Sequence, residues 1–289
     1  MSIRQLAVVS GKGGTGKTSI VAVFAALAER KVLADCDVDA PDLHLILKPE
    51  VLRREEFRGA KVAVVDGEKC TACGRCEEFC RFDAIKKGEV DEILCEGCGV
   101  CVVVCPEKAI TLQEKVSGYV FLSRTKYGFL SHAVLNAAEE NSGKLVTVVR
   151  QNALSVAERE ACRLILIDGP PGIGCPVIST LSGVDAALIV TEPTVSGLHD
   201  LERVLRLARH FNVRPFVCIN RYDLNAEMAV EMERFCEAEG VEVVGRVPYD
   251  VAVMRALAMG KPVVECSPRS PAAIEMKRVW ECLEATLRV

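Results

Sequence analysis

The sequence spells the pattern CxxCxxCxxxC twice between residues 70 and 105. The first run holds Cys70, Cys73, Cys76 and Cys80, and the second holds Cys95, Cys98, Cys101 and Cys105. Three closely spaced thiolates can surround one corner of a cubane cluster, while the fourth, three residues farther on, reaches the neighbouring cluster. The pattern therefore predicts two [4Fe–4S] clusters and a chain segment that folds around them.

The same geometry assigns the ligands crosswise between the two runs. Paired CxxC units also suit tetrahedral Zn²⁺, but a third cysteine at the same spacing in both runs argues against zinc. Pro106 follows the last cysteine of the second run, whereas Arg81 takes that place after the first. We predict a first cluster bound by Cys70, Cys73, Cys76 and Cys105, and a second bound by Cys95, Cys98, Cys101 and Cys80.

A phosphate-binding loop lies near the N-terminus, between an apolar stretch (LAVVS) and a helical pattern (SIVAVFAALAE). In this context backbone N–H groups of a glycine-rich turn cradle phosphates, the lysine contacts the β/γ oxygens, and the following hydroxyl binds Mg²⁺. We predict these roles for Lys17 and Thr18, with ATP or ADP as the nucleotide. The loop consists of Gly11, Lys12, Gly13, Gly14, Thr15, Gly16, Lys17 and Thr18.

Length, charge and cysteine content indicate which class of protein this chain belongs to. The chain has 289 residues, half of them hydrophobic, enough for one large domain and a small insert. A net charge of −4 provides no bulk attraction to nucleic acid or anionic lipid, and no apolar run is long enough to span a bilayer. Fifteen cysteines, eight of them in the two runs, fit a reducing compartment. We expect a cytoplasmic protein that binds neither nucleic acid nor membrane.

Lys12 distinguishes this loop from the general phosphate-binding pattern, which does not require a second lysine at that position. It resembles the deviant Walker A motif of the MinD/ParA/nitrogenase iron-protein superfamily of P-loop ATPases. In that superfamily the corresponding lysine reaches across a nucleotide-sandwich dimer to the partner's phosphates, where it stabilises charge as an arginine finger does. The resemblance implies ATP hydrolysis with Lys12 and Lys17 as catalytic residues. It also implies a homodimer, or a heterodimer with a related ATPase.

Further segments extend the resemblance along most of the chain. Asp37, in VLADCDVDAPD, matches the switch I aspartate that positions the attacking water, whereas Asp35 and Asp39 also suit a turn that caps the next helix. LILIDGPPG resembles Walker B running into switch II, with Asp168 near the metal. Two later segments resemble those that contact adenine: INRYD, with Asn220 and Arg221, and VPYD, with Pro248.

The alternation of apolar strands and helices predicts an α/β fold, a mostly parallel, doubly wound P-loop NTPase sheet covered on both faces. We expect strands near Leu6, Val32, Val146, Ile165, Leu188, Val217 and Val243, and helices that begin near Lys17, Ser196, Ala226 and Ser270. The ATPase domain is predicted to be discontinuous, residues 1–58 and 117–289. An α+β bacterial-ferredoxin-like domain is predicted at 59–116, with strands KVAVV and AITL beside the cysteine runs.

Three further features are weighed against ordinary packing. The amphipathic C-terminal stretch is expected to pack in the core, since a membrane-targeting tail would be more basic. His132 and the segment GKLVTVVR are expected in a loop where the insert rejoins the ATPase. Cys175 lies where nitrogenase iron proteins place a ligand of the cluster that bridges their dimer, but we find no second match and expect a free thiol.

The resemblance leaves three functions open. One is an ATP-gated electron donor, in which dimer closure repositions two clusters against a redox partner. Another is a carrier that hands clusters or metal to client proteins, although no CxxC exists outside the eight ligands. The last is a spatial organiser, for which neither a basic surface nor a lipid-binding tail is evident. Full ferredoxin ligation favours electron transfer.

Overall fold

The computed structural model describes residues 3–136, 139 and 143–288. The chain divides into two compact units. The nucleotide unit comprises Met1–Arg54, Val120–Val134 and Asn141–Val289, and the cysteine unit comprises Glu55–Tyr119 and Leu135–Glu140. The sequence placed the insert at 59–116, inside the larger segment of the cysteine unit.

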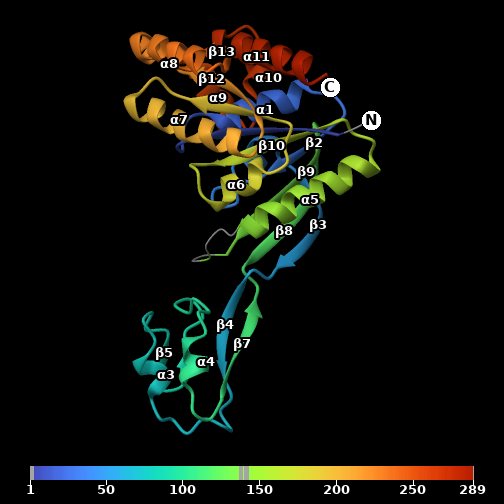
Figure 1. The fold of residues 1–289 in the computed structure, drawn as a ribbon. Helices are drawn as coiled ribbons and strands as arrows, with labels where there is room; N and C mark the ends of the chain where they lie inside the picture. Colours follow the sequence, from blue (N-terminus) through green and yellow to red (C-terminus); the bar gives the residue numbers. More distant parts are fainter. Residues whose placement is uncertain (1–2, 137–138, 140–142, 289) are drawn as a thin grey trace. The chain divides into compact units, whose positions relative to one another are not determined.

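The elements follow one another in the order shown in Figure 1. The strands are β1 (Arg4–Ser10), β2 (Lys31–Asp35), β3 (Glu50–Phe57), β4 (Ala60–Val65), β5 (Ile85–Lys86), β6 (Glu89–Val90), β7 (Ile110–Lys115), β8 (Gly118–Thr125), β9 (Gly128–Leu135), β10 (Leu164–Pro171), β11 (Ala186–Thr191), β12 (Arg214–Asn220) and β13 (Glu242–Val247). The helices are α1 (Lys17–Leu27), α2 (Leu43–Leu47), α3 (Arg75–Glu78), α4 (Val100–Val104), α5 (Gly143–Arg159), α6 (Cys175–Leu181), α7 (Val195–His210), α8 (Ala226–Ala238), α9 (Val251–Ala258), α10 (Val263–Cys266) and α11 (Pro271–Leu287), with a short 3₁₀ turn at Tyr222–Leu224.

A nine-stranded sheet in the order β13-β12-β11-β1-β10-β2-β9-β8-β3 organises the nucleotide unit. Its strands from β13 to β9 pair in parallel. The first strand lies between β10 and β11, so the loop after β1 opens at the carboxyl edge where ligands bind in open α/β sheets. The predicted mostly parallel α/β sheet is confirmed.

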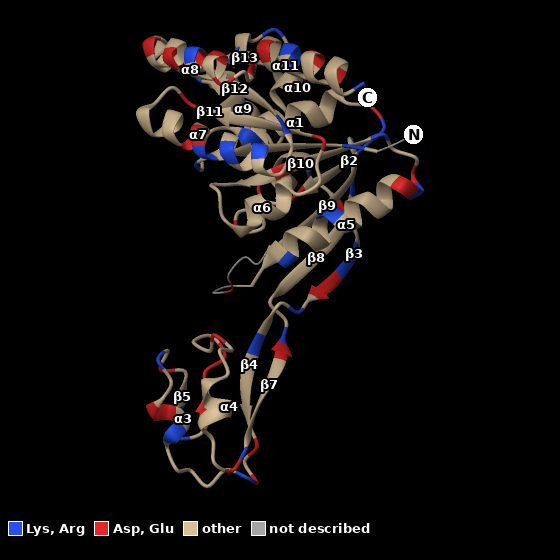
Figure 2. Ribbon diagram, viewed as in Figure 1, with Lys and Arg blue, Asp and Glu red and all other residues tan. Residues whose placement is uncertain are grey.

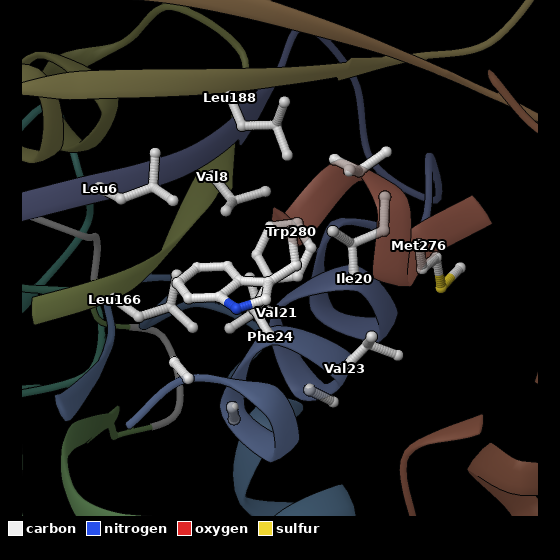
Figure 3. Packing of buried hydrophobic residues seen from close by; sticks show 14 of the residues in the cluster. Leu6, Val8, Ile20, Val21, Val23, Phe24, Leu166, Leu188, Met276 and Trp280 are labelled. Carbon is white, nitrogen blue, oxygen red and sulfur yellow. The ribbon is translucent and has the colours of Figure 1, made fainter. Parts of the chain in front are cut away.

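Helices cover both faces of this sheet. Leu6, Val8, Leu166 and Leu188 point to one face, where they pack with residues of α1 and α11 (Figure 3). The ring centroids of Phe24 and Trp280 lie 5.2 Å apart at the centre of this layer. The alternate residues of the same strands are also fully buried and point to the opposite face, on which α5, α6 and α7 pack.

The C-terminal helix α11 belongs to the core, as the sequence predicted. Seven of its residues are buried, at the spacing of one helical face. Ser270 caps its first turn by accepting a hydrogen bond from Ala273 N–H at 3.3 Å. Among the described residues, no helix combines the length and the apolar composition that crossing a bilayer requires.

The described cysteine unit contains two short antiparallel strand pairs and two short helices. β4 pairs antiparallel with β7 over the register Ala60↔Lys115 to Val65↔Ile110, and β5 pairs antiparallel with β6. The sequence-predicted strands KVAVV and AITL are confirmed. A small apolar cluster of Ala63, Ile85, Cys101 and Ile110 is buried here, and Cys76, Cys80, Cys95 and Cys105 pack against it.

Hydrogen bonds join the two ends of the large segment of the cysteine unit to each other. Ser117 N–H donates to the Phe57 carbonyl at 2.8 Å. The Ser117 hydroxyl accepts from the backbone N–H groups of Gly59 and Ala60 at 3.3 and 2.9 Å. The incoming and outgoing strands are therefore hydrogen-bonded where they enter and leave.

Three predictions for the region after the insert are wrong. The strand expected near Val146 and the loop expected for the segment GKLVTVVR (Gly143–Arg150) both lie in the helix α5, in which buried residues recur at Leu145, Val149, Ala153 and Val156. His132 lies in the strand β9 rather than in a loop, with its side chain 5% exposed. The β-branched run VTVV suggested a strand, but the helical spacing of the buried positions over the longer segment determines the structure.

Candidate functional site

The loop between β1 and α1 forms an anion-binding cradle. Gly16 adopts φ +91°, which glycine takes without strain, and no side chain caps the first turn of α1. The N–H groups of that turn are therefore available to a phosphate. Lys17, the first residue of the helix, is only 5% exposed. The Ser10 hydroxyl at the end of β1 donates to the Lys12 carbonyl at 2.6 Å and fixes the start of the loop.

Two aspartates lie side by side at the carboxyl edge of the sheet. Asp168 of β10 and Asp35 of β2 are partners in the parallel register, and both are buried. Asp35 accepts hydrogen bonds from the backbone N–H groups of Asp37 and Leu43, at 3.2 and 3.3 Å. Neither carboxylate oxygen of Asp168 has such a partner. A buried carboxylate without a partner is costly, so its surroundings suit a cation such as Mg²⁺.

The raised pKa values of these carboxyl groups also indicate that a bound cation would stabilise the site. Burial raises the pKa of Asp168 to about 7, against the opposing effects of the Lys17 charge and the Thr18 hydroxyl. Burial also raises the pKa of Asp37 to about 6. The pKa of Asp35 lies well above its ordinary value, because of burial first and then the neighbouring Asp168 and Asp37. A bound divalent cation would favour the ionised forms.

The residues predicted to contact adenine line a common cavity of about 40 Å³ next to the loop. Asn220, at the end of β12, donates from Nδ2 to the Thr15 carbonyl at 2.7 Å. A Cβ on Gly16 would lie 2.5 Å from the same Nδ2 atom, so glycine is required there for close approach. The lining includes Gly16, Ser19, Asn220, Arg221, Pro248, Tyr249, Val253 and Met254. Their assignment to the base remains a prediction.

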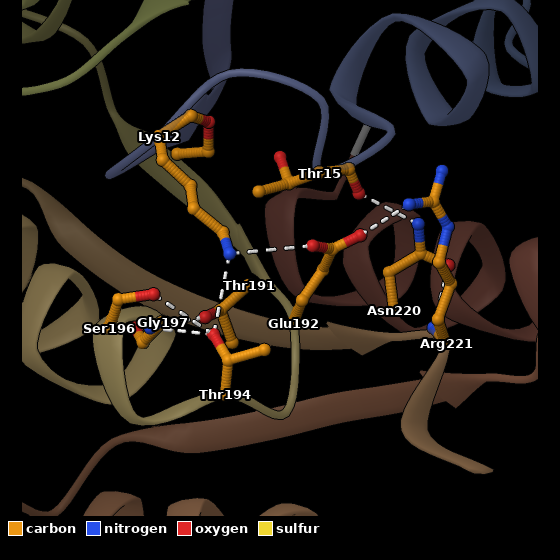
Figure 4. A network of polar contacts seen from close by, with 10 residues as sticks. Lys12, Thr15, Thr191, Glu192, Thr194, Ser196, Gly197, Asn220 and Arg221 are labelled. Atoms are coloured by element: carbon orange, nitrogen blue, oxygen red, sulfur yellow. Dashed lines mark hydrogen bonds and ion pairs between the residues drawn. The ribbon is translucent and has the colours of Figure 1, made fainter. Parts of the chain in front are cut away.

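Lys12 is held by residues that follow β11 (Figure 4). Its Nζ lies 3.6 Å from Oε2 of Glu192 and donates to Oγ1 of Thr194 at 3.3 Å. The other oxygen of Glu192 accepts from Arg221 at 2.6 Å. One carboxylate thus joins the phosphate loop to the segment that lines the small cavity.

The sequence reasoning missed Glu192 and Thr194. A signal was available, because the apolar strand AALIVT is followed directly by polar residues at the sheet edge where ligands bind. Thr194 also caps α7 by accepting from Gly197 N–H at 2.9 Å, so a capping function alone explains that residue type.

The eight cysteines of the two runs lie around two separate cavities in the cysteine unit. Cys70, Cys73, Cys76 and Cys105 line a cavity of about 210 Å³. Cys80, Cys95, Cys98 and Cys101 line another, of about 20 Å³. Each cavity thus combines three cysteines of one run with the last cysteine of the other.

The two runs also share a backbone conformation. Gly74 and Gly99, each directly after the second cysteine of its run, adopt φ +77° and +78° and precede the short helices α3 and α4. Burial raises the pKa of the Cys76 and Cys101 thiols, and nearby cysteine thiolates raise it further. Within the described residues, no group of three His, Cys, Asp or Glu side chains is arranged to hold a single metal ion.

Cys175 begins α6, and the β10 strand that precedes it contains Asp168. Its side chain is exposed and its thiol is free. The turn between them contains Gly172, whose N–H donates to the Ser10 carbonyl at 2.8 Å. This segment therefore contacts the start of the phosphate-binding loop through its backbone.

Comparison with known families accounts for the nucleotide unit. A model of the CobQ/CobB/MinD/ParA nucleotide binding domain matches residues 6–263. The chain belongs to this family. The predicted membership of the MinD/ParA superfamily of P-loop ATPases is thereby confirmed, and with it a nucleotide site in the CobQ/CobB/MinD/ParA domain.

Individual relatives resemble the chain in sequence, and a solved structure resembles it in fold. An uncharacterised protein of Methanocaldococcus jannaschii is 32% identical over 98% of this chain and 97% of its own length. The MinD protein of Pyrococcus horikoshii, solved with Mg-ADP, is 19% identical with a TM-score of 0.59 and covers 98% of this chain and 97% of that one. An iron-sulfur cluster carrier protein of Pyrococcus horikoshii is 28% identical over 46% of this chain and 50% of its own length.

Proposed function

We propose that this member of the CobQ/CobB/MinD/ParA family is a Mg²⁺-dependent ATPase whose ATP-driven dimer closure is coupled to electron transfer through two [4Fe–4S] clusters. The observation that carries the proposal is the crosswise grouping of eight cysteines around two cavities, in the same chain as a phosphate-binding loop. The redox partner is not specified by these features.

The nucleotide chemistry follows from the residues at the sheet edge. Lys17 neutralises the β/γ-phosphate oxygens, while Thr18 and Asp168 would hold Mg²⁺. Asp37 orients the attacking water. Lys12 of one subunit stabilises the charge on the phosphates bound by the other, so hydrolysis requires the dimer. Asn220, Arg221 and Pro248 surround the base. The burial of Lys17 and the unpartnered oxygens of Asp168 support these roles.

The donor set of the cysteine unit fits cubane clusters. Each iron of a [4Fe–4S] cluster takes one cysteine thiolate, so the four thiolates spread around a cavity rather than converge on one ion. This accounts for four cysteines per cavity without a three-ligand site for a single metal ion among the residues that the structure describes. When bound, the clusters supply one-electron transfer.

The small core of the cysteine unit supports the same assignment. Its buried apolar cluster centres on four residues, with four further cysteines packed against it. A unit of this size seldom folds on so few apolar contacts and usually needs a metal or a disulfide. The cysteines of the chain are free thiols. Binding to the clusters would therefore contribute directly to folding.

Two measurements on anaerobically purified protein test the proposal, one for the clusters and one for their coupling to ATP. We expect about eight iron and eight acid-labile sulfides per chain, as two cubane clusters require. We also expect a non-hydrolysable ATP analogue to bind the oxidised and the dithionite-reduced protein with different affinities, because coupling between two sites is reciprocal. Stoichiometric zinc without sulfide would contradict the cluster assignment. Equal affinities would contradict the coupling.

A cluster or metal carrier is the second candidate, favoured by the similarity to iron-sulfur cluster carrier proteins over about half of the chain. An exposed Cys175 after the switch II segment is also compatible with it. A carrier should release its clusters to an apo-ferredoxin faster in the presence of ATP, whereas an electron donor should keep its iron through many turnovers. Iron retained by this protein after incubation with an apo-ferredoxin distinguishes the two.

A MinD-like organiser is compatible with the fold, which resembles solved MinD structures. The C-terminal helix offers little to a lipid surface, because its apolar face is buried in the core. Acidic and basic residues are interspersed along its exposed side (Figure 2). Sedimentation with anionic vesicles in the presence of ATP would favour this third function.

A further inference from the structure

Glu192 occupies an unusual position between two cations. It follows β11 directly, and its side chain is 15% exposed. One carboxylate oxygen lies 3.6 Å from Lys12 Nζ, and the other accepts from Arg221 at 2.6 Å. The dimer mechanism gives Glu192 no function, although it contacts the lysine on which that mechanism depends.

We propose that Glu192 is a positioning residue that holds Lys12 against its own subunit until nucleotide and a second copy of the chain draw the lysine away. The inference rests on the proposed sandwich dimer and deepens it by identifying what opposes dimer formation. In the free chain, the carboxylate supplies the negative charge that the partner's nucleotide phosphates supply in the dimer.

The geometry allows the Lys12 side chain to move away from Glu192 while Glu192 keeps its position. The Lys12 contact is the longer of the two, and its side chain is 32% exposed, so solvent weakens the pair. Arg221 holds Glu192 at shorter distance. The turn that carries Glu192 is also braced, because Thr194 N–H donates to the Glu192 carbonyl at 2.8 Å and Thr191 donates to the Gly197 carbonyl at 3.1 Å.

Arg221 connects this contact to the nucleotide. It follows Asn220 and lines the small cavity beside Gly16. A base that moves Arg221 would change the charge environment of Glu192 and weaken its hold on Lys12. Nucleotide binding in one subunit would thereby prepare the lysine for the other.

The contact itself is tested in the nucleotide-free chain. An N-hydroxysuccinimide ester labels accessible amines, and peptide-resolved mass spectrometry reports the rate at Lys12. Glu192→Gln removes the carboxylate charge and should raise that rate severalfold. Glu202→Gln on α7 is the matched control, since Glu202 forms an exposed ion pair with Arg206 and should leave the Lys12 rate unchanged. Equal rates in wild type and Glu192→Gln would overturn the contact.

The consequence is tested by the ATP-analogue concentration at which half of the protein is dimeric, measured by analytical ultracentrifugation. A partly exposed ion pair at 3.6 Å contributes little, so releasing it should lower that concentration about two- to fivefold in Glu192→Gln. A rise in that concentration would show that Glu192 promotes the dimer and would refute the proposal. Glu192→Asp, which keeps the charge but shortens the side chain, should fall between wild type and Glu192→Gln.

The two readouts separate this inference from the proposed function. If wild type stays monomeric with the ATP analogue, the sandwich dimer fails whatever the labelling shows. If wild type dimerises and Glu192→Gln behaves like Glu202→Gln in both assays, the dimer stands and the function of Glu192 fails. Circular dichroism of each variant confirms that the fold is retained.

Discussion

If the two runs share their cysteines crosswise, one pair of double variants should differ in cluster content. If each run bound its own cluster, the same pair should differ in the opposite direction. In the structure Cys105 shares a cavity with Cys70, whereas Cys98, which belongs to the same run as Cys105, lines the other cavity. The double variant Cys70→Ala/Cys105→Ala removes two ligands of one site and leaves the other intact. Cys98→Ala/Cys105→Ala removes one ligand from each site.

The magnitude follows from four iron atoms per cluster. The first double variant should retain one fully ligated cluster, about four iron and four sulfides per chain, whereas the second should retain no cluster with four cysteine ligands. If each run bound its own cluster, the outcomes would be exchanged. Each variant loses two cysteines, so a general loss of stability cannot produce the difference.

The assay is iron and acid-labile sulfide per chain after anaerobic purification, with electron paramagnetic resonance of the dithionite-reduced protein. Cys175→Ala is the control, because this exposed thiol lies in the nucleotide unit, and it should keep the wild-type load. An intact [4Fe–4S] signal in Cys98→Ala/Cys105→Ala together with its absence in Cys70→Ala/Cys105→Ala would refute the crosswise assignment.

Three further predictions concern the nucleotide unit. Lys17→Ala should abolish binding of a fluorescent ATP analogue, whereas Asp37→Ala should bind it and remain dimeric on gel filtration without hydrolysis; hydrolysis at the wild-type rate in Asp37→Ala would contradict its assignment. Burial, and then the His44 charge, lower the pKa of His132 to about 4, so the unfolded chain binds more protons below pH 6.5. The contribution of His132 to the free energy of unfolding should therefore fall by about 2 kcal/mol between pH 8 and pH 5, while the raised pKa values of Asp37 and Asp168 act in the opposite direction. Urea unfolding of wild type and His132→Gln at both pH values, followed by Trp280 fluorescence, isolates this contribution: the change in the free energy of unfolding from pH 8 to pH 5 should be about 2 kcal/mol more favourable in the variant. Arg150 donates to the carbonyls of Ser179 and Ser182, both at 2.7 Å, so Arg150→Met should cost about 3 kcal/mol by leaving them without a donor; an unchanged urea midpoint would refute this.

Local patterns predicted the elements that carry their own signals. Helix α1 follows a glycine loop, α11 begins at a serine cap, and β1 and β10 are apolar runs, so each was found in the sequence. The region from Gly118 to Arg159 was not, because β8 and β9 lack a distinctive turn and α5 contains a β-branched run. Its structure depends on tertiary burial, which outweighs local propensity.

Some residues of the candidate site could likewise be predicted from the sequence, and others could not. Lys17 and the cysteines belong to motifs whose spacing is set by the ligand, and the sequence alone identifies them. Glu192 belongs to no such motif, since it meets Lys12 across 180 residues of chain. The contact between Glu192 and Lys12 arises because the strand order places β11 beside β1. No short segment of the sequence predicts that order.

The hydrogen bond between Phe57 and Ser117 has a consequence for how the segment between them can be inserted or deleted. A segment whose ends are already hydrogen-bonded to each other imposes little strain on the strands that carry it. It can be gained or lost in one genetic event, with a short turn in its place and the host sheet unchanged. A relative that lacks residues between 58 and 116 would still close the same pair of strands.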